Sequence, residues 1–386
     1  MKIKQLTVFN LKLPFNNKHA HDSDRWPYGQ SILVKVEDEK GFVGYGEGRP
    51  CPDLTGETVV SATQMIAYVL WPAIANFNFP DFSSDADALA ILEFFQKVRV
   101  SESHPHVRSW NVSWCAVEMA LIDCALRRAS FSFGNVFEPK RKVLEYTGVI
   151  TARDPAVIAD LAKKKVDAGF SQVRIKITQD YVRQIEAARS VLDRNFPIVV
   201  DANGCFSFDE GLSACRELKE RFDVSLVEDP IPRGKYQLGR FIEFCQKSKV
   251  DIMADNWLIT DKDLERLTAK PSVSVFYLKV SRCGGIYQTM KMAQKAYQSG
   301  IGIAIGSHVG ETGMLSLVGR HIGAWLPEVF FISGSAGIGR LREDIIVEDV
   351  RPGCSGSAET SQNIGFGYTV KPDIIDKFSM YKKVLN

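Results

Sequence analysis

The chain has 386 residues, which exceeds one ordinary hydrophobic core and predicts two domains, or a barrel with a second domain. Its composition, 45% hydrophobic and 24% charged, is typical of globular proteins. The chain has 48 Lys and Arg residues and 46 Asp and Glu residues, so its charges nearly balance. No overall positive charge favours nucleic acid or acidic membranes as partners.

The first fifteen residues alternate apolar and polar side chains, which predicts a strand and not a signal peptide. No apolar stretch of the sequence has the length needed to cross a bilayer. The eight cysteines show no CxxC or other metal-ligand spacing. We therefore expect reduced, mostly buried thiols, a cytoplasmic location, and neither a membrane nor a nucleic-acid partner.

Residues 1–140 have the pattern of an α+β unit. Ile3–Leu13 and Ser31–Val36 alternate like antiparallel strands, and Gly41–Gly46 supplies a turn between strands. Two later segments, Val59–Val69 and Trp114–Leu126, repeat their apolar residues with a helical period. We expect the strands and helices of this first domain to form one packed unit.

Residues 141–345 alternate short apolar strands with amphipathic helices. The predicted strands are Val143–Thr147, Gln172–Ile177, Pro197–Val200, Ser225–Val227, Ile252–Ala254, Val275–Lys279, Gly302–Ile305 and Glu328–Ile332. The predicted helices include Pro155–Ala168, Tyr181–Arg194, Phe208–Phe222 and Tyr287–Ser299. Eight such repeats predict an α/β fold with a (β/α)8 TIM-like barrel, the alternative being an open doubly wound sheet. Residues 346–386, with turn and strand signals at Asn363–Pro372, are predicted to return to the first domain.

A charged residue ends strand after strand of the predicted barrel. These residues are Lys176, Asp201, Glu228, Asp255 and Lys279. Consecutive members lie one βα unit apart, so a barrel brings all of them to the rim where active sites form. Three carboxylates this close resist joint ionisation, and a hard divalent cation such as Mg²⁺ would relieve the repulsion. The alternative is that each one is a separate helix N-cap or ion-pair partner.

The lysines on strands two and six would face each other across the carboxylates. Nearby positive charge makes a lysine an effective base, and a metal ion and Arg174 would supply that charge to Lys176. Two bases on opposite sides of one carbon suggest removal of a proton from one face and return to the other. Arg174 cannot act as a base, because arginine stays protonated in proteins. We expect it to bind the substrate carboxylate.

Motifs along nearly the whole chain resemble the enolase superfamily, specifically the muconate-lactonising and dipeptide-epimerase-like branch of its mandelate racemase group. In order they are "GYGEG" (44–48), "CAVEMALIDCAL" (115–126), "VDANG" (200–204), "VEDP" (227–230) and "LKVSRCGGI" (278–286). The resemblance implies a capping domain built from the N-terminal region and the C-terminal tail. It also implies one Mg²⁺ per active site, with Mn²⁺ as a substitute, held by Asp201, Glu228 and Asp255.

The same resemblance implies Lys176 and Lys279 as the two bases. It assigns specificity to two capping loops, about His19–Tyr28 with Arg25 and Trp26, and Arg49–Glu57. Further expected substrate-binding residues are Asn203, His308 and Glu311, with a helix N-terminal charge as the alternative role for Glu311. We expect Asp229 to be a structural partner of a cation at the rim, and the protein to be a homo-oligomer.

Three departures from the family pattern concern the substrate. Arg174 stands where a Lys is usual, Asn256 follows Asp255 where Glu is common, and strand eight ends "ISGSAG" without the Asp-x-Asp of dipeptide epimerases. Without that acidic pair, a blocked amino group, a betaine-like group or a plain carboxylic acid is favoured over a free ammonium.

The predicted function is Mg²⁺-dependent abstraction of the α-proton of a small carboxylate substrate through an enediolate. Racemisation or epimerisation of an amino-acid derivative or dipeptide-like compound is the leading outcome, because both lysines are present. A cycloisomerase or a dehydratase acting by syn-elimination, like muconate-lactonising enzyme or o-succinylbenzoate synthase, is the alternative. A hypothesis of another class is a non-catalytic, metal-stabilised binding barrel.

Overall fold

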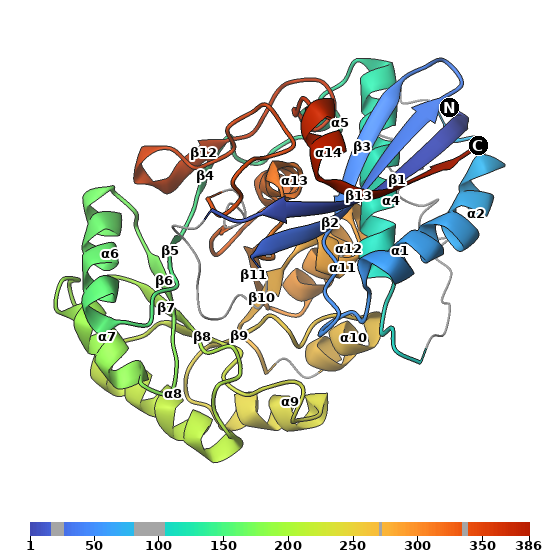
Figure 1. Cartoon of the computed structure of the whole chain (residues 1–386). Helices are drawn as coiled ribbons and strands as arrows, with labels where there is room; N and C mark the ends of the chain where they lie inside the picture. Colours follow the sequence, from blue (N-terminus) through green and yellow to red (C-terminus); the bar gives the residue numbers. More distant parts are fainter. Residues whose placement is uncertain (17–26, 81–104, 270–271, 334–338) are drawn as a thin grey trace.

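The computed structural model describes residues 1–16, 27–80, 105–269, 272–333 and 339–386. The two larger of the three sheets in these residues are one antiparallel with four strands and one parallel with seven (Figure 1). The parallel sheet curls into a barrel-like wall with helices on its outer side, and the antiparallel sheet caps it. The predicted fold class is confirmed.

The capping sheet joins both ends of the chain. Its order is β13-β1-β2-β3, made of Ser379–Leu385, Ile3–Pro14, Tyr28–Asp38 and Val43–Gly48. Helix α4 (Asn111–Ala129) packs against β3, and the glycines of that strand allow the approach. A Cβ on Gly44 or Gly46 would lie 2.2 Å from a carbonyl oxygen of α4, so only glycine fits. Three short helical segments follow β3: α1 (Val59–Met65), η2 (Ile66–Leu70) and α2 (Trp71–Ala75).

The parallel sheet follows the chain from one edge to the other. Its strands are β5 (Gly148–Ile150), β6 (Val173–Lys176), β7 (Ile198–Asp201), β8 (Leu226–Glu228), β9 (Ile252–Ala254), β10 (Val275–Leu278) and β11 (Gly302–Ile305). The helices between these strands are α6 (Pro155–Asp167), α7 (Tyr181–Arg189), α8 (Phe208–Phe222), α9 (Leu238–Lys247), α10 (Asp261–Ala269), α11 (Val280–Cys283) and α12 (Ile286–Gln298), and α13 (Gly313–Trp325) follows β11. Inside the curl, Val199, Leu226, Met253, Val275, Tyr277, Ala304 and Phe331 form a small separate core.

The eighth strand is reduced to one residue. Ile332 forms isolated parallel bridges to Ile305 of β11 and to Tyr146, so it links the two edges of the curled sheet. Its carbonyl oxygen accepts from the backbone N of Thr147 at 2.9 Å. Phe330 and Phe331 of the predicted strand Glu328–Ile332 also form backbone hydrogen bonds with Ile303 and Ile305 of β11.

The predicted first barrel strand, Val143–Thr147, is confirmed only at its end, where Tyr146 and Thr147 pair with Ile332. Val143–Glu145 form β4, which pairs antiparallel with β12 (Ser357–Glu359) outside the parallel sheet. Only Leu144 of β4 is buried, and this pattern suits a two-stranded ribbon with one covered face. The barrel strand is β5, which begins one residue after the predicted segment.

The segment Asn363–Pro372 contacts the first domain, in agreement with the predicted return of the C-terminal residues. It has two isolated bridges, one between Gly365 and Ser132 and one between Val370 and Ile346. Helix α14 (Pro372–Phe378) follows, and β13 after it pairs with β1. The two termini lie side by side (Figure 1).

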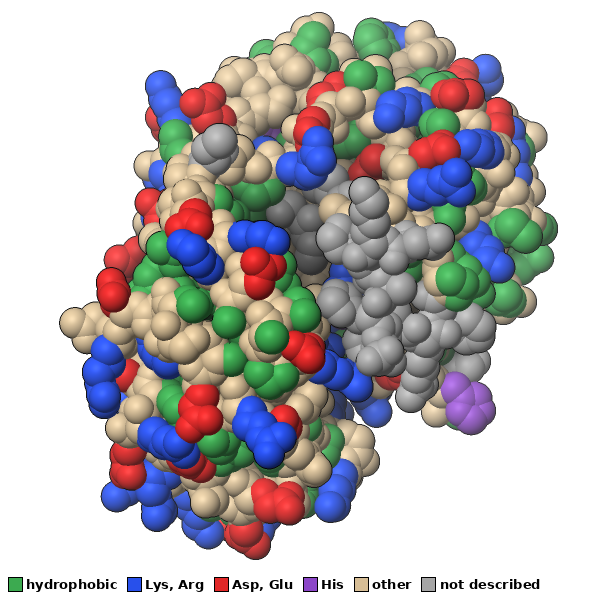
Figure 2. All heavy atoms as spheres, turned by 60° about the vertical axis from the view of Figure 1, so that its left-hand side comes forward, with side chains coloured by type: hydrophobic (Ala, Val, Ile, Leu, Met, Phe, Trp, Pro, Cys, Tyr) green, Lys and Arg blue, Asp and Glu red, His purple; other side chains and the backbone are tan. Residues whose placement is uncertain are grey.

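Cationic and anionic side chains are interspersed over the face shown in Figure 2. Among the helices in the described ranges, none combines the length and the apolar character needed to cross a membrane. Seven cysteines within those ranges are free thiols, and most are buried.

Candidate active site

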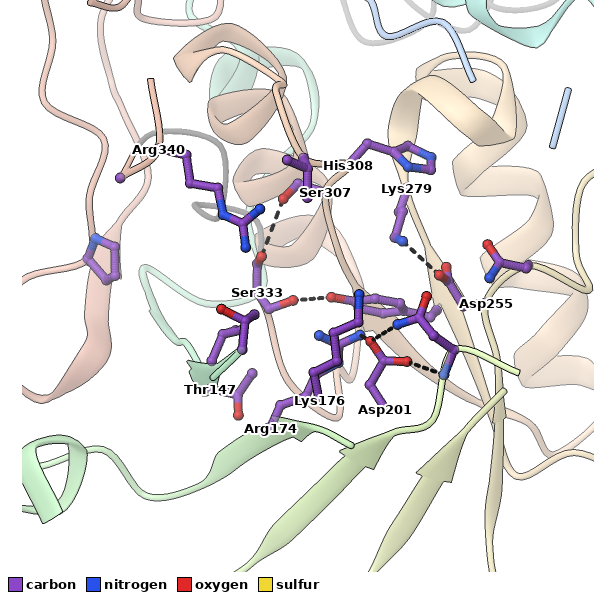
Figure 3. Close-up of a pocket in the computed structure, with 18 of the residues that line it drawn as sticks. Thr147, Arg174, Lys176, Asp201, Asp255, Lys279, Ser307, His308, Ser333 and Arg340 are labelled. Atoms are coloured by element: carbon purple, nitrogen blue, oxygen red, sulfur yellow. Dashed lines mark hydrogen bonds and ion pairs between the residues drawn. The ribbon is translucent and has the colours of Figure 1, made fainter. Parts of the chain in front are cut away.

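The charged strand ends meet as the spacing predicts. In the parallel register Lys176 pairs with Asp201, and Asp201 pairs with Glu228. Asp255 and Lys279 directly follow β9 and β10. Figure 3 shows Lys176, Asp201, Asp255 and Lys279 around one cavity of about 500 Å³.

Arg174 is bound to two of the three carboxylates. Its Nε and Nη2 donate to both oxygens of Glu228, each at 2.7 Å, and Nη2 also donates to Oδ2 of Asp201 at 2.7 Å. All three side chains are nearly inaccessible to solvent. The guanidinium lies 5.3 Å from the ring centroid of Tyr277, which lies on β10 two residues before Lys279. Arg174 therefore acts here as the counter-ion of the predicted metal ligands.

The third carboxylate has two other cationic partners. Lys279 Nζ donates to Asp255 Oδ2 at 2.7 Å, and the fully buried Arg282 donates to Oδ1. Burial alone would raise the pKa of Asp255, but Arg282 and Lys279 hold it well below its usual value. Burial would lower the pKa of Lys279, but Asp255 raises it above its usual value.

Arg282 is a site residue that sequence reasoning missed. It could have been predicted from its position three residues after Lys279, on the one-turn helix α11. That spacing places both side chains near the same strand end. Tyr277, Ser307, Ser333 and Arg340 also line the cavity and were not predicted.

The ligand set fits Mg²⁺ in chemistry and place. Asp201, Glu228 and Asp255 present only hard oxygen donors from three adjacent strand ends. Among the described residues no three His, Cys, Asp or Glu side chains are arranged to hold a metal as they stand. Arg174, Lys279 and Arg282 donate to the oxygens of these carboxylates.

Lys176 differs from Lys279 in its surroundings. It is partly exposed and lines the cavity. Within the described parts of the chain it has no ion pair, whereas Lys279 is 7% exposed and bound to Asp255. Both amines reach the same cavity from different strands (Figure 3). The two predicted bases are therefore together but not equivalent.

The remaining predicted substrate contacts divide into two kinds. Asn203 and His308 line the cavity. Asn203 donates to both oxygens of Asp201, from its backbone N at 3.0 Å and from Nδ2 at 2.7 Å. His308 Nε2 is buried without a hydrogen-bond partner in the described structure, and burial lowers the pKa of the ring well below its usual value. His308 is thus part of the cavity wall.

Glu311 is not among the described residues that line the cavity. It is buried, burial raises its pKa to about 8, and it accepts from the backbone N of His308 at 2.7 Å. Asp229 has a similar backbone role, accepting from the N of Asp255 and of Asn256. Among the described residues Asp229 forms no ion pair, but its charge interacts with that of Arg282 at the rim.

The capping loops are described only in part. Arg25 and Trp26 lie outside the described residues. From the second loop, Leu54 lines the cavity. Arg49 connects that loop to the barrel, since its Nε donates to the carbonyl oxygen of Val309 at 2.9 Å.

A family model described as "Enolase C-terminal domain-like" matches residues 157–374, more than half of the chain. The chain belongs to this family. The sequence-based identification as an enolase-superfamily enzyme is thus confirmed.

Relatives within the enolase superfamily are enzymes with related reactions. The N-succinyl-L-Arg/Lys racemase of Bacillus cereus is 23% identical, over 83% of this chain and 84% of its own. Its crystal structure superposes with a TM-score of 0.85 at 20% identity, covering both chains completely. The o-succinylbenzoate synthase of Enterococcus faecalis is 24% identical over 100% of both chains.

A third relative is the hydrophobic dipeptide epimerase of Enterococcus faecalis, 25% identical over 84% of this chain and 87% of its own. A crystal structure of the dipeptide epimerase from Enterococcus faecalis V583, complexed with Mg and L-Leu-L-Tyr, has a TM-score of 0.79 at 23% identity. It covers 96% of this chain and 100% of its own. These structural likenesses establish the enolase fold.

Proposed function

We propose that this enolase-family enzyme racemises or epimerises a carboxylate substrate by moving its α-proton between two lysines. The observation that carries the proposal is the placement of Lys176 and Lys279 in one cavity with Asp201 and Asp255. Glu228 ends the strand next to Asp201. Those carboxylates would hold Mg²⁺. When bound, the ion supplies positive charge that stabilises negative charge on a substrate carboxylate.

The surroundings of the lysines suggest their starting protonation states. Lys279 is bound to Asp255 and enters the reaction as the ammonium acid. Lys176, without an ion pair in the described structure, is the base that removes the proton. The resulting enediolate is reprotonated on its opposite face by Lys279, so the configuration inverts. In the reverse direction the two lysines exchange roles.

The substrate we favour is an N-acylated amino acid whose acyl group carries a second anion. The sequence has no acidic residue from Ile332 to Arg342 to receive a free ammonium. Two further cationic residues, Lys165 and Arg340, line the cavity and suit a second carboxylate. The named substrates of the Bacillus cereus racemase carry a succinyl group on nitrogen. The free cysteines support our proposal of a cytoplasmic location.

A second candidate is elimination of water, as in an o-succinylbenzoate synthase. This candidate is favoured by the similarity to the o-succinylbenzoate synthase of Enterococcus faecalis, which extends over the whole length of both chains. The same first proton transfer serves both reactions, so product analysis must separate them.

We also propose that the protein is a homo-oligomer.

The test is hydrogen exchange in D₂O with Mg²⁺ and three substrate sets: N-succinyl amino acids, N-acetyl amino acids and dipeptides. The wild-type enzyme should exchange the α-proton of both enantiomers of its substrate, as read by mass. Lys176→Met and Lys279→Met should each lose racemisation, because only one face of the carbon keeps a base. Exchange that persists in the double variant would disprove the two-lysine assignment. A product lighter by one water would favour elimination.

A further inference from the structure

Arg174 holds the oxygens that a metal ion would need. Its guanidinium binds both oxygens of Glu228, and one of its nitrogens also binds Oδ2 of Asp201. Oδ1 of Asp201 accepts from the backbone N of Asn203 at 3.0 Å. All four oxygens of these two carboxylates are thus engaged inside the protein.

The pairing is stable because of its geometry and burial. A bidentate guanidinium–carboxylate pair is among the stronger charge-assisted contacts, and the Glu228 side chain is 2% exposed. The face of the Tyr277 ring supports the guanidinium from the barrel interior. A lysine in the same place would present one point charge and could not bind both Glu228 oxygens in this fork geometry.

A guanidinium and a divalent cation compete for the same carboxylate oxygens. Both are positive, and their repulsion at such short range in a buried site is large. We infer that Arg174 is an internal competitor of the divalent cation, which binds Asp201 and Glu228 only after the guanidinium has left them. This inference rests on the Mg²⁺ use assigned in the proposed function. It makes Arg174 a positioning residue that sets the metal affinity.

The direct test is Mg²⁺ titration by calorimetry of the metal-free wild-type enzyme and of Arg174→Lys and Arg174→Met. Both variants should bind Mg²⁺ about tenfold tighter or more, equivalent to about 1.4 kcal/mol, because the competitor is weakened or removed. Arg174→Lys keeps a cation and is the variant expected to fold normally. Mg²⁺ should also raise the melting temperature of the variants more than that of the wild type.

The matched control is Lys165→Met, which removes a different positive charge from the same cavity. Lys165 contacts the Phe170 ring and, among the described residues, pairs with no carboxylate. The Mg²⁺ affinity of the Lys165→Met variant should equal that of the wild-type enzyme. Equal tightening in Lys165→Met and Arg174→Met would indicate a general charge effect and overturn the inference.

Equal or weaker Mg²⁺ binding in both Arg174 variants would also overturn the inference while leaving the proposed function intact, provided that α-proton exchange continues. Failure of every variant to bind Mg²⁺ would overturn it together with the metal dependence of the proposed function. The two proposals therefore fail with different results.

Discussion

Arg174 and Lys176 lie two residues apart on β6 and face the same cavity, but their contacts differ. Arg174 is 9% exposed and bound to two carboxylates, whereas Lys176 is partly exposed with no ion pair in the described structure. The pair is therefore a fixed counter-ion beside an amine that can exchange a proton. An arginine in place of Lys176 could not act as a base, because a guanidinium does not deprotonate in proteins.

At this scale we predict that Lys176→Arg abolishes α-proton exchange while Arg174→Lys retains a measurable part. The expected loss in Lys176→Arg is at least about 10²- to 10⁴-fold, the usual contribution of a general base. Exchange rates by mass spectrometry in D₂O at saturating Mg²⁺ measure both. Equal losses in the two variants would show that their roles are wrongly divided.

The site depends on elements of both sheets. Glu47 of β3 is fully buried and accepts from Ser31 Oγ at 2.6 Å and from Oγ1 of Thr312, the N-cap of α13, also at 2.6 Å. This contact ties the capping sheet to the helix after β11. The loop between β11 and α13 carries His308 into the cavity, so Glu47 helps to position one wall of the site.

Glu47 should make stability depend on pH. Burial raises its pKa to about 6 in the folded protein, from 4.5 in the unfolded chain, despite hydrogen bonds that oppose the change. The folded state therefore binds more protons between these values, and the stability present at lower pH is lost as pH rises from 4.5 through 6. The loss is about 2 kcal/mol.

Urea unfolding between pH 4 and 7 measures this effect. The free energy of unfolding of Glu47→Gln, relative to the wild type, should rise across the same range, because Gln does not titrate. Glu328→Gln, at an exposed carboxylate, serves as the control and should follow the wild type. Parallel curves for Glu47→Gln and the wild type would contradict the assignment.

At the scale of the whole molecule, the chain closes on itself through β13. This strand pairs antiparallel with β1 from Leu6↔Leu385 to Leu11↔Ser379, so the last segment covers the edge of the capping sheet. An uncovered edge strand exposes unpaired N–H and C=O groups and promotes association. The N-terminal sheet therefore needs the C-terminal residues to be complete.

Removal of residues 379–386 should lower the melting temperature by several degrees and increase aggregation, because β1 becomes an open edge. Thermal unfolding and light scattering measure the two effects. Lys383→Gln keeps the strand and is the control, since the Lys383 side chain is hydrogen-bonded to exposed Tyr68. A truncated protein with unchanged melting and no aggregation would show that β13 adds little.

Local patterns predicted most of the elements. Phe208–Phe222 was predicted with the observed bounds of α8. Helix α6 differs from its predicted bounds by one residue at its C-terminal end, and α12 by one residue at each end. Where the prediction failed in part, at Val143–Thr147, a short apolar segment had two pairing options. Its choice of β12 depends on a segment more than 200 residues later, which no local pattern reveals.

The sequence by itself determined which residues meet at the rim. Side chains alternate along strands, and one βα unit separates Lys176, Asp201, Glu228, Asp255 and Lys279, so a closed parallel sheet must gather them. Only the tertiary structure decided how these charges pair. Arg174 binds Glu228 and Asp201, and Arg282 binds Asp255. Several cationic side chains lie near these carboxylates, and side-chain length and burial decide which of them forms each pair. Spacing along the chain carries no information on that choice.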